Sequence, residues 1–320
     1  MARQGTALHA KATRPQTPPD FGIPLESMKQ TDVVELPSFT WDKVPEASVQ
    51  AEVTDALESG SVISLPGMVF PLSESELRLL DPRILAKAKN VSYSPATGEV
   101  GGTSCTGTEA QTIKEMMSRY ARMSQELLIH LFPSYKGTVK VRRTSLRPAE
   151  VAGRHSSWRK DDTLLHVDAF PSQPTHGERI IRIFCNVNPA GRPRMWRVGE
   201  PFETVARRFL PRIGRPFPGS ALAMRAVGLT KTVRSEYDHI MLKLHDSMKS
   251  DPEYQKSVGQ TPVPFHAGTT WIVYSDSVSH GALSGQHQFE QTFYLPLAGM
   301  KDVGKSPLRI LERLRGRALA

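Results

Sequence analysis

Residues 163–168 read Thr-Leu-Leu-His-Val-Asp, an apolar run that ends in His166 and Asp168. We expect this run to be a β-strand that becomes polar at its end. Side chains at positions i and i+2 of a strand project from the same face, so the imidazole and the carboxylate point to one place. Such a pair supplies two of the ligands that a divalent metal ion needs.

A third ligand must come from another part of the chain, and His280 is the best candidate. The segment before it, residues 271–279, is expected to be an apolar strand that ends in polar residues, and Gly281 follows His280. Two histidines and one carboxylate on a β scaffold form a facial triad, which leaves coordination positions open and is typical of non-haem Fe(II) oxygenases. The histidines that compete for this role are His155, His176, His266 and His287.

Two other interpretations of these residues remain open. His166 and Asp168 also fit a buried hydrogen-bonded pair, with His280 as one of ten histidines that has no special role. A hydrolytic zinc site would use the same three side chains. The chain has no His-Glu-x-x-His helix that would support the zinc site.

The pattern of elements predicts an antiparallel sandwich or barrel in the second half of the chain. With 39% hydrophobic residues among 320, the chain can bury a sizeable core. Short β-branched or alternating segments are separated by Pro and Gly. They are residues 138–146, 163–168, 179–187, 270–274 and 289–297. Helical periodicity is clearest at residues 110–132, and two further helices are expected at 201–208 and 235–248.

We therefore divide the chain into four parts. Residues 1–40 form a flexible leader, and residues 41–139 form a helical N-terminal part packed on the core. Residues 140–300 form the β-rich core. Residues 301–320 form a basic C-terminal helix, in which Ser306 caps the first turn and leucines recur every three residues. This helix either rests on an anionic membrane surface or packs on its own domain.

The basic charge of the chain is concentrated in its middle third. Residues 140–234 contain 19 basic and 7 acidic residues, a net charge of +12. Such a field is either a solvated surface or the binding face for an anion: nucleic acid, phosphorylated lipid or acidic sugar. We disfavour nucleic acid because the aromatic residues do not interleave with the basic ones and no nucleic-acid-binding motif is present.

The cellular compartment is indicated by sequence features that are missing. Cys105 and Cys185 fit neither a disulfide framework nor a zinc motif, and there is no signal peptide or membrane-length apolar run. We expect a cytoplasmic protein.

Several stretches resemble the Kdo hydroxylase family of Gram-negative bacteria. They are His-Val-Asp-Ala-Phe-Pro at 166–171, Arg-Ile-Phe-Cys-Asn-Val-Asn-Pro at 182–189, Arg-Met-Trp-Arg-Val-Gly-Glu-Pro-Phe at 194–202, Ser-His-Gly at 279–281 and Glu-Gln-Thr-Phe-Tyr-Leu-Pro at 290–296. The resemblance implies an α+β protein with a double-stranded β-helix (jelly-roll, cupin-like) core and flanking helices. It also implies an Fe(II)/2-oxoglutarate dioxygenase that uses O2 to hydroxylate C3 of the outer Kdo sugar of the lipopolysaccharide inner core, on a Kdo2-lipid A precursor. The alternatives are a non-catalytic β-sandwich binder of anionic sugars and a basic nucleic-acid-binding protein.

2-Oxoglutarate needs a buried cation for its far carboxylate. No Lys or Arg follows His280 before Lys301, so we choose Arg182, on the strand after the His-x-Asp pair, with Gln291 or His287 as polar alternatives.

Arg194 and Arg197 follow a Gly-Arg-Pro turn. We expect them either at the mouth of the site, holding anionic groups of a glycolipid, or in a solvent-facing loop. A glycolipid substrate would also bring the enzyme into peripheral contact with the inner face of the inner membrane.

Overall fold

The structure is a computed structural model, and it describes residues 31–154 and 156–320. Residues 1–30 of the predicted leader lie outside these residues, as does His155, whereas residues 31–40 are described and include a short strand at Val33–Glu35.

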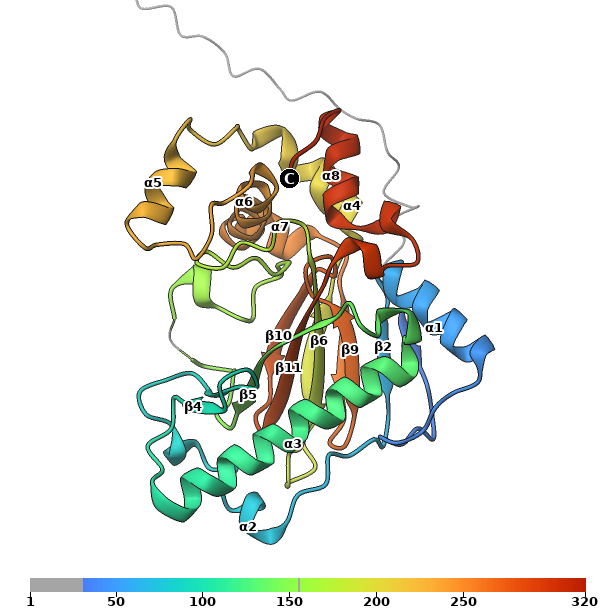
Figure 1. The fold of residues 1–320 in the computed structure, drawn as a ribbon, viewed down its shortest axis with the longest axis vertical. Helices are drawn as coiled ribbons and strands as arrows, with labels where there is room; N and C mark the ends of the chain where they lie inside the picture. Colours follow the sequence, from blue (N-terminus) through green and yellow to red (C-terminus); the bar gives the residue numbers. More distant parts are fainter. Residues whose placement is uncertain (1–30, 155) are drawn as a thin grey trace, which may run out of the picture.

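Two sheets form the core, and their inner faces pack on each other (Figure 1). The larger sheet contains, side by side, β5 (Lys140–Arg147), β11 (Gln288–Leu295), β6 (Arg179–Asn186) and β9 (Thr270–Tyr274). The smaller sheet contains β10 (His280–Ser284), β7 (Arg194–Val198) and β8 (Thr261–Phe265). This arrangement is the jelly-roll that the sequence predicts.

Side chains along β6 point alternately to the outer and the inner face of the larger sheet. Ile181 and Ile183 are fully buried in a cluster with helices on the outer face. Phe184 packs instead against residues of the smaller sheet, and Arg182 lies on the same inner face. Arg182 therefore projects between the two sheets, where a small molecule can be enclosed.

The N-terminal part extends the larger sheet at both edges. β1 (Val33–Glu35) and β2 (Val62–Leu65) continue it beyond β9, and β3 (Val91–Ser94) and β4 (Glu99–Gly101) continue it beyond β5. Two helices, α1 (Ala47–Glu58) and α3 (Gly107–Leu131), cover its outer face (Figure 1). Residues 41–139 thus contribute strands as well as helices.

The short helix α2 (Glu74–Leu77) begins at a capping box. Ser73 accepts a hydrogen bond from the Glu76 amide, and the Glu76 side chain accepts one from the Ser73 amide. Short 3-10 turns lie at Pro82–Ile84, Pro133–Tyr135, Trp158–Lys160, Leu210–Arg212, Leu297–Gly299 and Val303–Lys305.

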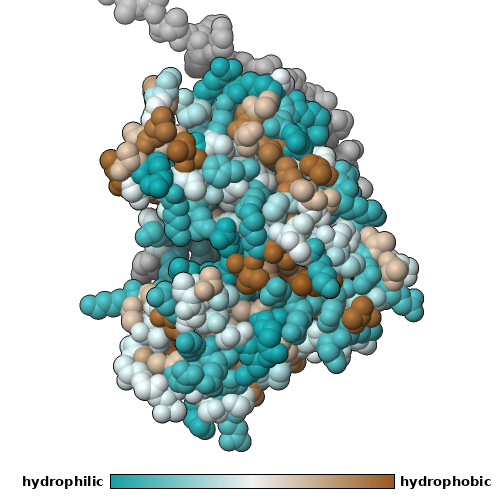
Figure 2. Space-filling view, in the orientation of Figure 1, coloured by the Kyte–Doolittle hydropathy of each residue, from teal (hydrophilic) through white to brown (hydrophobic). Residues whose placement is uncertain are grey.

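Five further helices gather at one end of the sheets (Figure 1). They are α4 (Phe202–Phe209), α5 (Ser220–Ala226), α6 (Glu236–Ser250), α7 (Pro252–Ser257) and α8 (Pro307–Arg315). Apolar side chains gather on the surface over α5 (Figure 2). None of the described helices is long and apolar enough to cross a membrane.

The C-terminal helix α8 packs on its own domain. Ser306 caps it by accepting from the Arg309 amide. Leu308 and Leu311 are buried in one cluster with Phe209 of α4 and Leu244 of α6. Because the apolar face is used by the fold, it is not available to a membrane.

The sequence prediction of strands is wrong in two respects. Residues 163–168 are not a strand, since only His166 pairs with a neighbour, in an isolated bridge. The three strands of the smaller sheet also went unpredicted as strands. In β8, Pro262 and Pro264 interrupt the expected pattern, and they are tolerated because β8 is an edge strand that needs fewer backbone donors.

Leu311→Ala should lower the free energy of unfolding by about 2–5 kcal/mol, because it opens a cavity where the side chain is fully buried. Arg313→Ala is the control: it removes only an exposed ion pair with Glu203 and should cost at most about 1 kcal/mol. Urea denaturation measures both. Equal losses would contradict the docking of α8.

Candidate active site

A short loop carries the His-x-Asp pair to the smaller sheet. The His166 amide donates to the His280 carbonyl at 3.0 Å, and the His280 amide donates to the His166 carbonyl at 2.9 Å. Two residues further on, the Asp168 amide donates to the Ser275 carbonyl at 2.7 Å. These backbone bonds replace the expected strand and bring the three side chains together.

His166, Asp168 and His280 each offer one ligand atom, and these atoms lie within 4.8 Å of one another. All three residues are 5–8% exposed. Across residues 31–154 and 156–320, no other trio of His, Cys, Asp or Glu meets this condition. The geometry is that of a metal site with three protein ligands.

The competing histidines that the structure describes lie away from this point. His176 contacts the Thr232 hydroxyl at 2.9 Å, and His266 is exposed. His287 is buried, but its Nε2 faces the side-chain amide of Gln286 at 2.8 Å. None of the three lines the cavity at which His166 and His280 meet.

Hydrogen bonds determine which nitrogen of each ring faces the cavity. Nδ1 of His166 lies 2.8 Å from the Leu164 carbonyl, and Nδ1 of His280 lies 2.8 Å from the Val278 carbonyl. A carbonyl oxygen only accepts, so each Nδ1 carries the hydrogen and each Nε2 has a free lone pair. Burial lowers the pKa of both imidazoles, which keeps them neutral and able to bind a metal.

An aromatic ring holds His280 in place from the other side. Trp196 of β7 stacks on the His280 ring with centroids 5.0 Å apart and an angle of 18°. Trp196 is itself 2% exposed, so its orientation is determined by packing between the two sheets.

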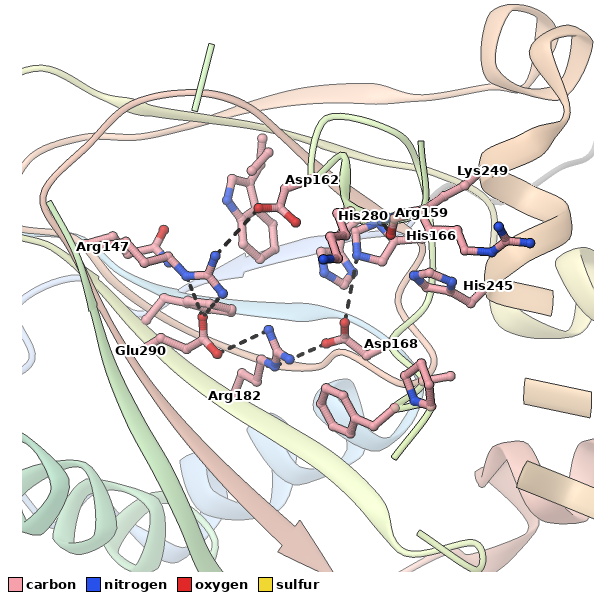
Figure 3. A pocket seen from close by; sticks show the side chains of 18 of the residues that line it. Arg147, Arg159, Asp162, His166, Asp168, Arg182, His245, Lys249, His280 and Glu290 are labelled. Atoms are coloured by element: carbon pink, nitrogen blue, oxygen red, sulfur yellow. Dashed lines mark hydrogen bonds and ion pairs between the residues drawn. The ribbon is translucent and has the colours of Figure 1, made fainter. Parts of the chain in front are cut away.

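The trio lies at a cavity of about 420 Å³ between the inner faces of the sheets and α6. Figure 3 shows His166, Asp168 and His280 turned toward one another, while His245 and Lys249 approach from α6. The His245 ring meets the His166 ring edge-on at 5.4 Å.

A chain of alternating charges crosses the floor of this cavity (Figure 3). Arg182 lies between Asp168, at 3.1 Å, and Glu290, at 3.2 Å. Arg147 lies between Glu290, at 2.9 Å, and Asp162, at 3.6 Å. Burial opposes ionisation of Asp168, but the charge of the Arg182 guanidinium outweighs it and lowers the pKa of this carboxyl.

The predicted anchors of the cosubstrate occupy different surroundings. Arg182 lines the cavity but is already placed between two carboxylates. Gln291 is fully buried on the opposite face of β11, where its carbonyl accepts from the Thr144 hydroxyl at 2.6 Å. His287 also lies outside the cavity lining, so neither polar alternative reaches the site.

The two arginines expected at the mouth are placed differently from each other. Arg194 lines the cavity, is 2% exposed, and donates to the Gly285 carbonyl at 2.6 Å. Arg197 lies outside the lining and donates to the Thr163 carbonyl at 2.7 Å and to Gln255 at 2.8 Å. Gln255 also bonds the backbone of Leu165, so Arg197 positions the loop that carries His166.

Sequence reasoning missed several charged or titratable residues that line the cavity, among them Arg147, His245, Lys249 and Glu290. Glu290 follows His280 by ten residues and lies on β11, the stretch after His280 that has no Lys or Arg to bind the far carboxylate of 2-oxoglutarate. His245 and Lys249 are one helical turn apart, so they share a face of α6. Helical spacing was therefore a usable signal for the last two.

A jelly-roll that presents two neutral imidazoles and one carboxylate at a cavity between its sheets defines the class of non-haem iron oxygenases. A model of the family described as 3-deoxy-D-manno-oct-2-ulosonic acid (Kdo) hydroxylase matches residues 40–318. The chain belongs to the Kdo hydroxylase family, as the sequence resemblance predicts.

Solved structures agree with this assignment. The apo Kdo hydroxylase KdoO is 43% identical, with a TM-score of 0.88 over 90% of this chain and 97% of that chain. KdoO with alphaketoglutarate and Fe(III) is 42% identical, with a TM-score of 0.88 over 91% and 98%. KdoO with succinate and Fe(III) is 42% identical, with a TM-score of 0.88 over 90% and 97%. No curated protein sequence matches significantly. Neither the sugar-binding sandwich nor the nucleic-acid-binding alternative is supported.

His280→Ala should weaken Fe(II) binding by more than the roughly 10–100-fold typical of losing an outer-shell partner, because it removes one of three direct ligands. His166→Ala and Asp168→Ala should act alike, and circular dichroism should show folded protein. Anaerobic calorimetric titration with Fe(II) measures the affinity. The exposed His266→Ala is the matched control; weaker binding in this variant, with normal binding in His280→Ala, would contradict the assignment.

Proposed function

We propose that this protein hydroxylates C3 of the outer Kdo sugar on a lipid A precursor, using Fe(II), 2-oxoglutarate and O2. The observation that carries the proposal is the buried trio of His166, Asp168 and His280 at the wall of a cavity between the two sheets. Membership of the Kdo hydroxylase family, and KdoO relatives described with Fe(III) and alphaketoglutarate or succinate, support the same chemistry.

The residues present fit an iron ion. Both free Nε2 atoms face the Asp168 carboxylate, and His166 Nε2 lies 3.8 Å from Asp168 Oδ1. Asp168 Oδ2 is buried and makes no hydrogen bond, although Arg182 is near enough for an ion pair. An ionised carboxylate oxygen without a hydrogen-bond donor is available to a cation. His166, Asp168 and His280 would hold the metal.

Bound iron with 2-oxoglutarate and O2 supplies the oxidant: one oxygen atom enters the C–H bond of the sugar, and the other enters succinate as CO2 leaves. The protein's own side chains do the positioning. Trp196 and the two carbonyls hold the imidazoles, and Arg182 holds Asp168 ionised and in one orientation. The aromatic rings of Phe170, which is half-buried, and of Phe184, which is buried, line the cavity and reduce the access of water to it.

We propose Arg194 as the anchor of the 2-oxoglutarate far carboxylate, with Arg182 retained as the alternative. Within the described part of the chain, no carboxylate lies within ion-pair distance of Arg194, and its Nε has no partner. Burial, together with the nearby Arg147 charge, lowers the pKa of Arg194 to about 10. A buried cation without a counter-ion gains most from a bound anion. Arg182 already has two carboxylate neighbours.

The substrate side of the cavity carries the remaining basic residues. Arg159 and Lys160 come from the turn before the His-x-Asp loop, and Lys249 comes from α6. We propose that they receive the carboxylate of an anionic Kdo glycolipid, and that the enzyme works in the cytoplasm at the inner face of the inner membrane. Arg194 and Arg197, proposed from the sequence for this task, are engaged deeper in the fold.

Arg194→Lys should raise the apparent KM for 2-oxoglutarate by roughly 10- to 100-fold, because a bidentate charged contact is lost. Arg182→Lys should instead lower kcat and leave this KM within a few-fold of wild type. Initial rates at varied 2-oxoglutarate measure both, and the exposed Arg192→Lys is the control. If Arg182→Lys alone raised the KM, Arg182 would be the anchor.

The proposed reaction predicts a product that carries one additional oxygen atom. Incubation of Kdo2-lipid A with Fe(II), 2-oxoglutarate and O2 should give one succinate for each hydroxylated lipid, measured by mass spectrometry. Fragmentation should place the oxygen on the outer sugar. Succinate formation without any change in the lipid would support the enzyme class and refute the substrate.

A further inference from the structure

An exposed apolar surface lies on the segment around α5. Of the ten large hydrophobic residues that are exposed in the described chain, five fall within residues 217–233. Their exposed fractions are Phe217 86%, Val227 70%, Leu222 64%, Leu229 64% and Val233 42%. Figure 2 shows these apolar side chains gathered over α5. Soluble proteins rarely expose such a cluster unless it contacts something.

The segment does not use these side chains for its own fold. No residue of α5 is buried. The buried residues on either side of the segment are Ile213, which is 5% exposed, and Thr230, which is 2% exposed. Beyond Thr230, the Lys231 amide donates to the Ser172 carbonyl at 2.9 Å. The apolar side chains between these points therefore face solvent in the isolated protein.

The same segment is strongly basic. Residues 204–235 contain no acidic residue and seven basic ones: Arg207, Arg208, Arg212, Arg215, Arg225, Lys231 and Arg234. Neither Arg215, which precedes α5, nor Arg225, in the last turn of α5, is within ion-pair distance of a carboxylate in the part of the chain that the structure describes. Apolar side chains interleaved with unpaired cations are typical of surfaces that insert into anionic bilayers.

A second copy of this chain fits the surface less well. In a two-fold symmetric contact each patch meets itself, so the arginines around α5 would be brought together. Like charges held close in an interface cost free energy. The charge therefore favours an anionic lipid surface over self-association.

The surface lies beside the catalytic cavity. The Arg234 guanidinium donates to the Pro171 carbonyl at 2.7 Å, and Pro171 lines the cavity together with Phe170. Lys231 lines a second hollow of about 520 Å³, which shares Phe170 and Arg182 with the catalytic cavity. The segment is thus joined directly to residues that line the catalytic cavity.

We infer that residues 215–234 dock the enzyme on an anionic phospholipid bilayer, with the apolar side chains in the interface and the arginines at the lipid headgroups. The inference rests on the proposed function in one respect: a lipid-linked substrate gives the docking its purpose. It replaces the C-terminal helix α8, whose leucines are buried, as the membrane-facing element.

Vesicle sedimentation tests this inference with protein that lacks iron, cosubstrate and sugar, so a failure of the hydroxylation proposal leaves the result readable. The protein should bind vesicles of phosphatidylethanolamine and phosphatidylglycerol, and bind phosphatidylcholine vesicles weakly. Phe217→Ser with Leu229→Ser should lower the partition coefficient about tenfold or more. Val44→Ser with Leu77→Ser, which changes two equally exposed apolar residues elsewhere, should leave it unchanged.

A charge variant tests the second half of the inference. Arg215→Gln with Arg225→Gln should lower binding to the anionic vesicles about fivefold per residue at low salt, and should flatten the dependence on salt. On detergent-dispersed substrate, all variants should turn over as wild type does, whereas turnover of substrate in vesicles should fall for both patch variants.

Three results would overturn the inference. The first is the absence of wild-type binding to anionic vesicles. The second is equal binding by the Phe217/Leu229 pair variant and the Val44/Leu77 control. The third is a wild-type dimer, detected by light scattering, that the Phe217/Leu229 variant converts to a monomer; this result would make a second copy the occupant.

Discussion

One antiparallel bridge, between His166 and His280, is the constraint on which the site depends. Its two hydrogen bonds join the loop that carries His166 to β10, an edge strand of the smaller sheet, more than one hundred residues later in the chain. Because paired residues of adjacent strands lie about 5 Å apart, the bridge brings both imidazoles together. The Asp168 amide bond to Ser275 then turns the carboxylate to the same point. Loss of this pairing would separate the three side chains even if each strand stayed folded.

Ion pairs fix the charged side chains of the cavity around the His166–His280 bridge. Each carboxylate on the floor, Asp168 and Glu290, has an arginine beside it, so burial does not neutralise it. Glu290, on β11, forms ion pairs with both Arg147 and Arg182. Arg194, on the smaller sheet, has no carboxylate within ion-pair distance among residues 31–154 and 156–320. In this cavity Arg147 and Arg182 are therefore paired with carboxylates of the protein, whereas Arg194 is available to a bound anion.

Local sequence patterns predicted the elements that obey one period over several residues. The long helix α3, the strands β6, β9 and β11, and the capped helix α8 all appear where periodicity and capping residues place them. The secondary-structure predictions failed where the sequence pattern is short, or where contacts with neighbouring strands determine the conformation. The loop at 163–168 has the composition of a strand but forms one bridge, and β8 accepts prolines only because it lies at an edge.

For the site, the sequence by itself determined the family and the chemical types of the metal ligands, since a His-x-Asp pair and a later strand-end His-Gly are local features. The tertiary structure alone decided which arginine is paired and which is free. It placed Arg182 between two carboxylates, turned Gln291 away from the cavity, and buried Arg194 within it. It also buried the leucines of α8 and exposed those around α5. The physical reason is that charge pairing and burial depend on residues distant in the chain, which strand pairing and packing bring into contact.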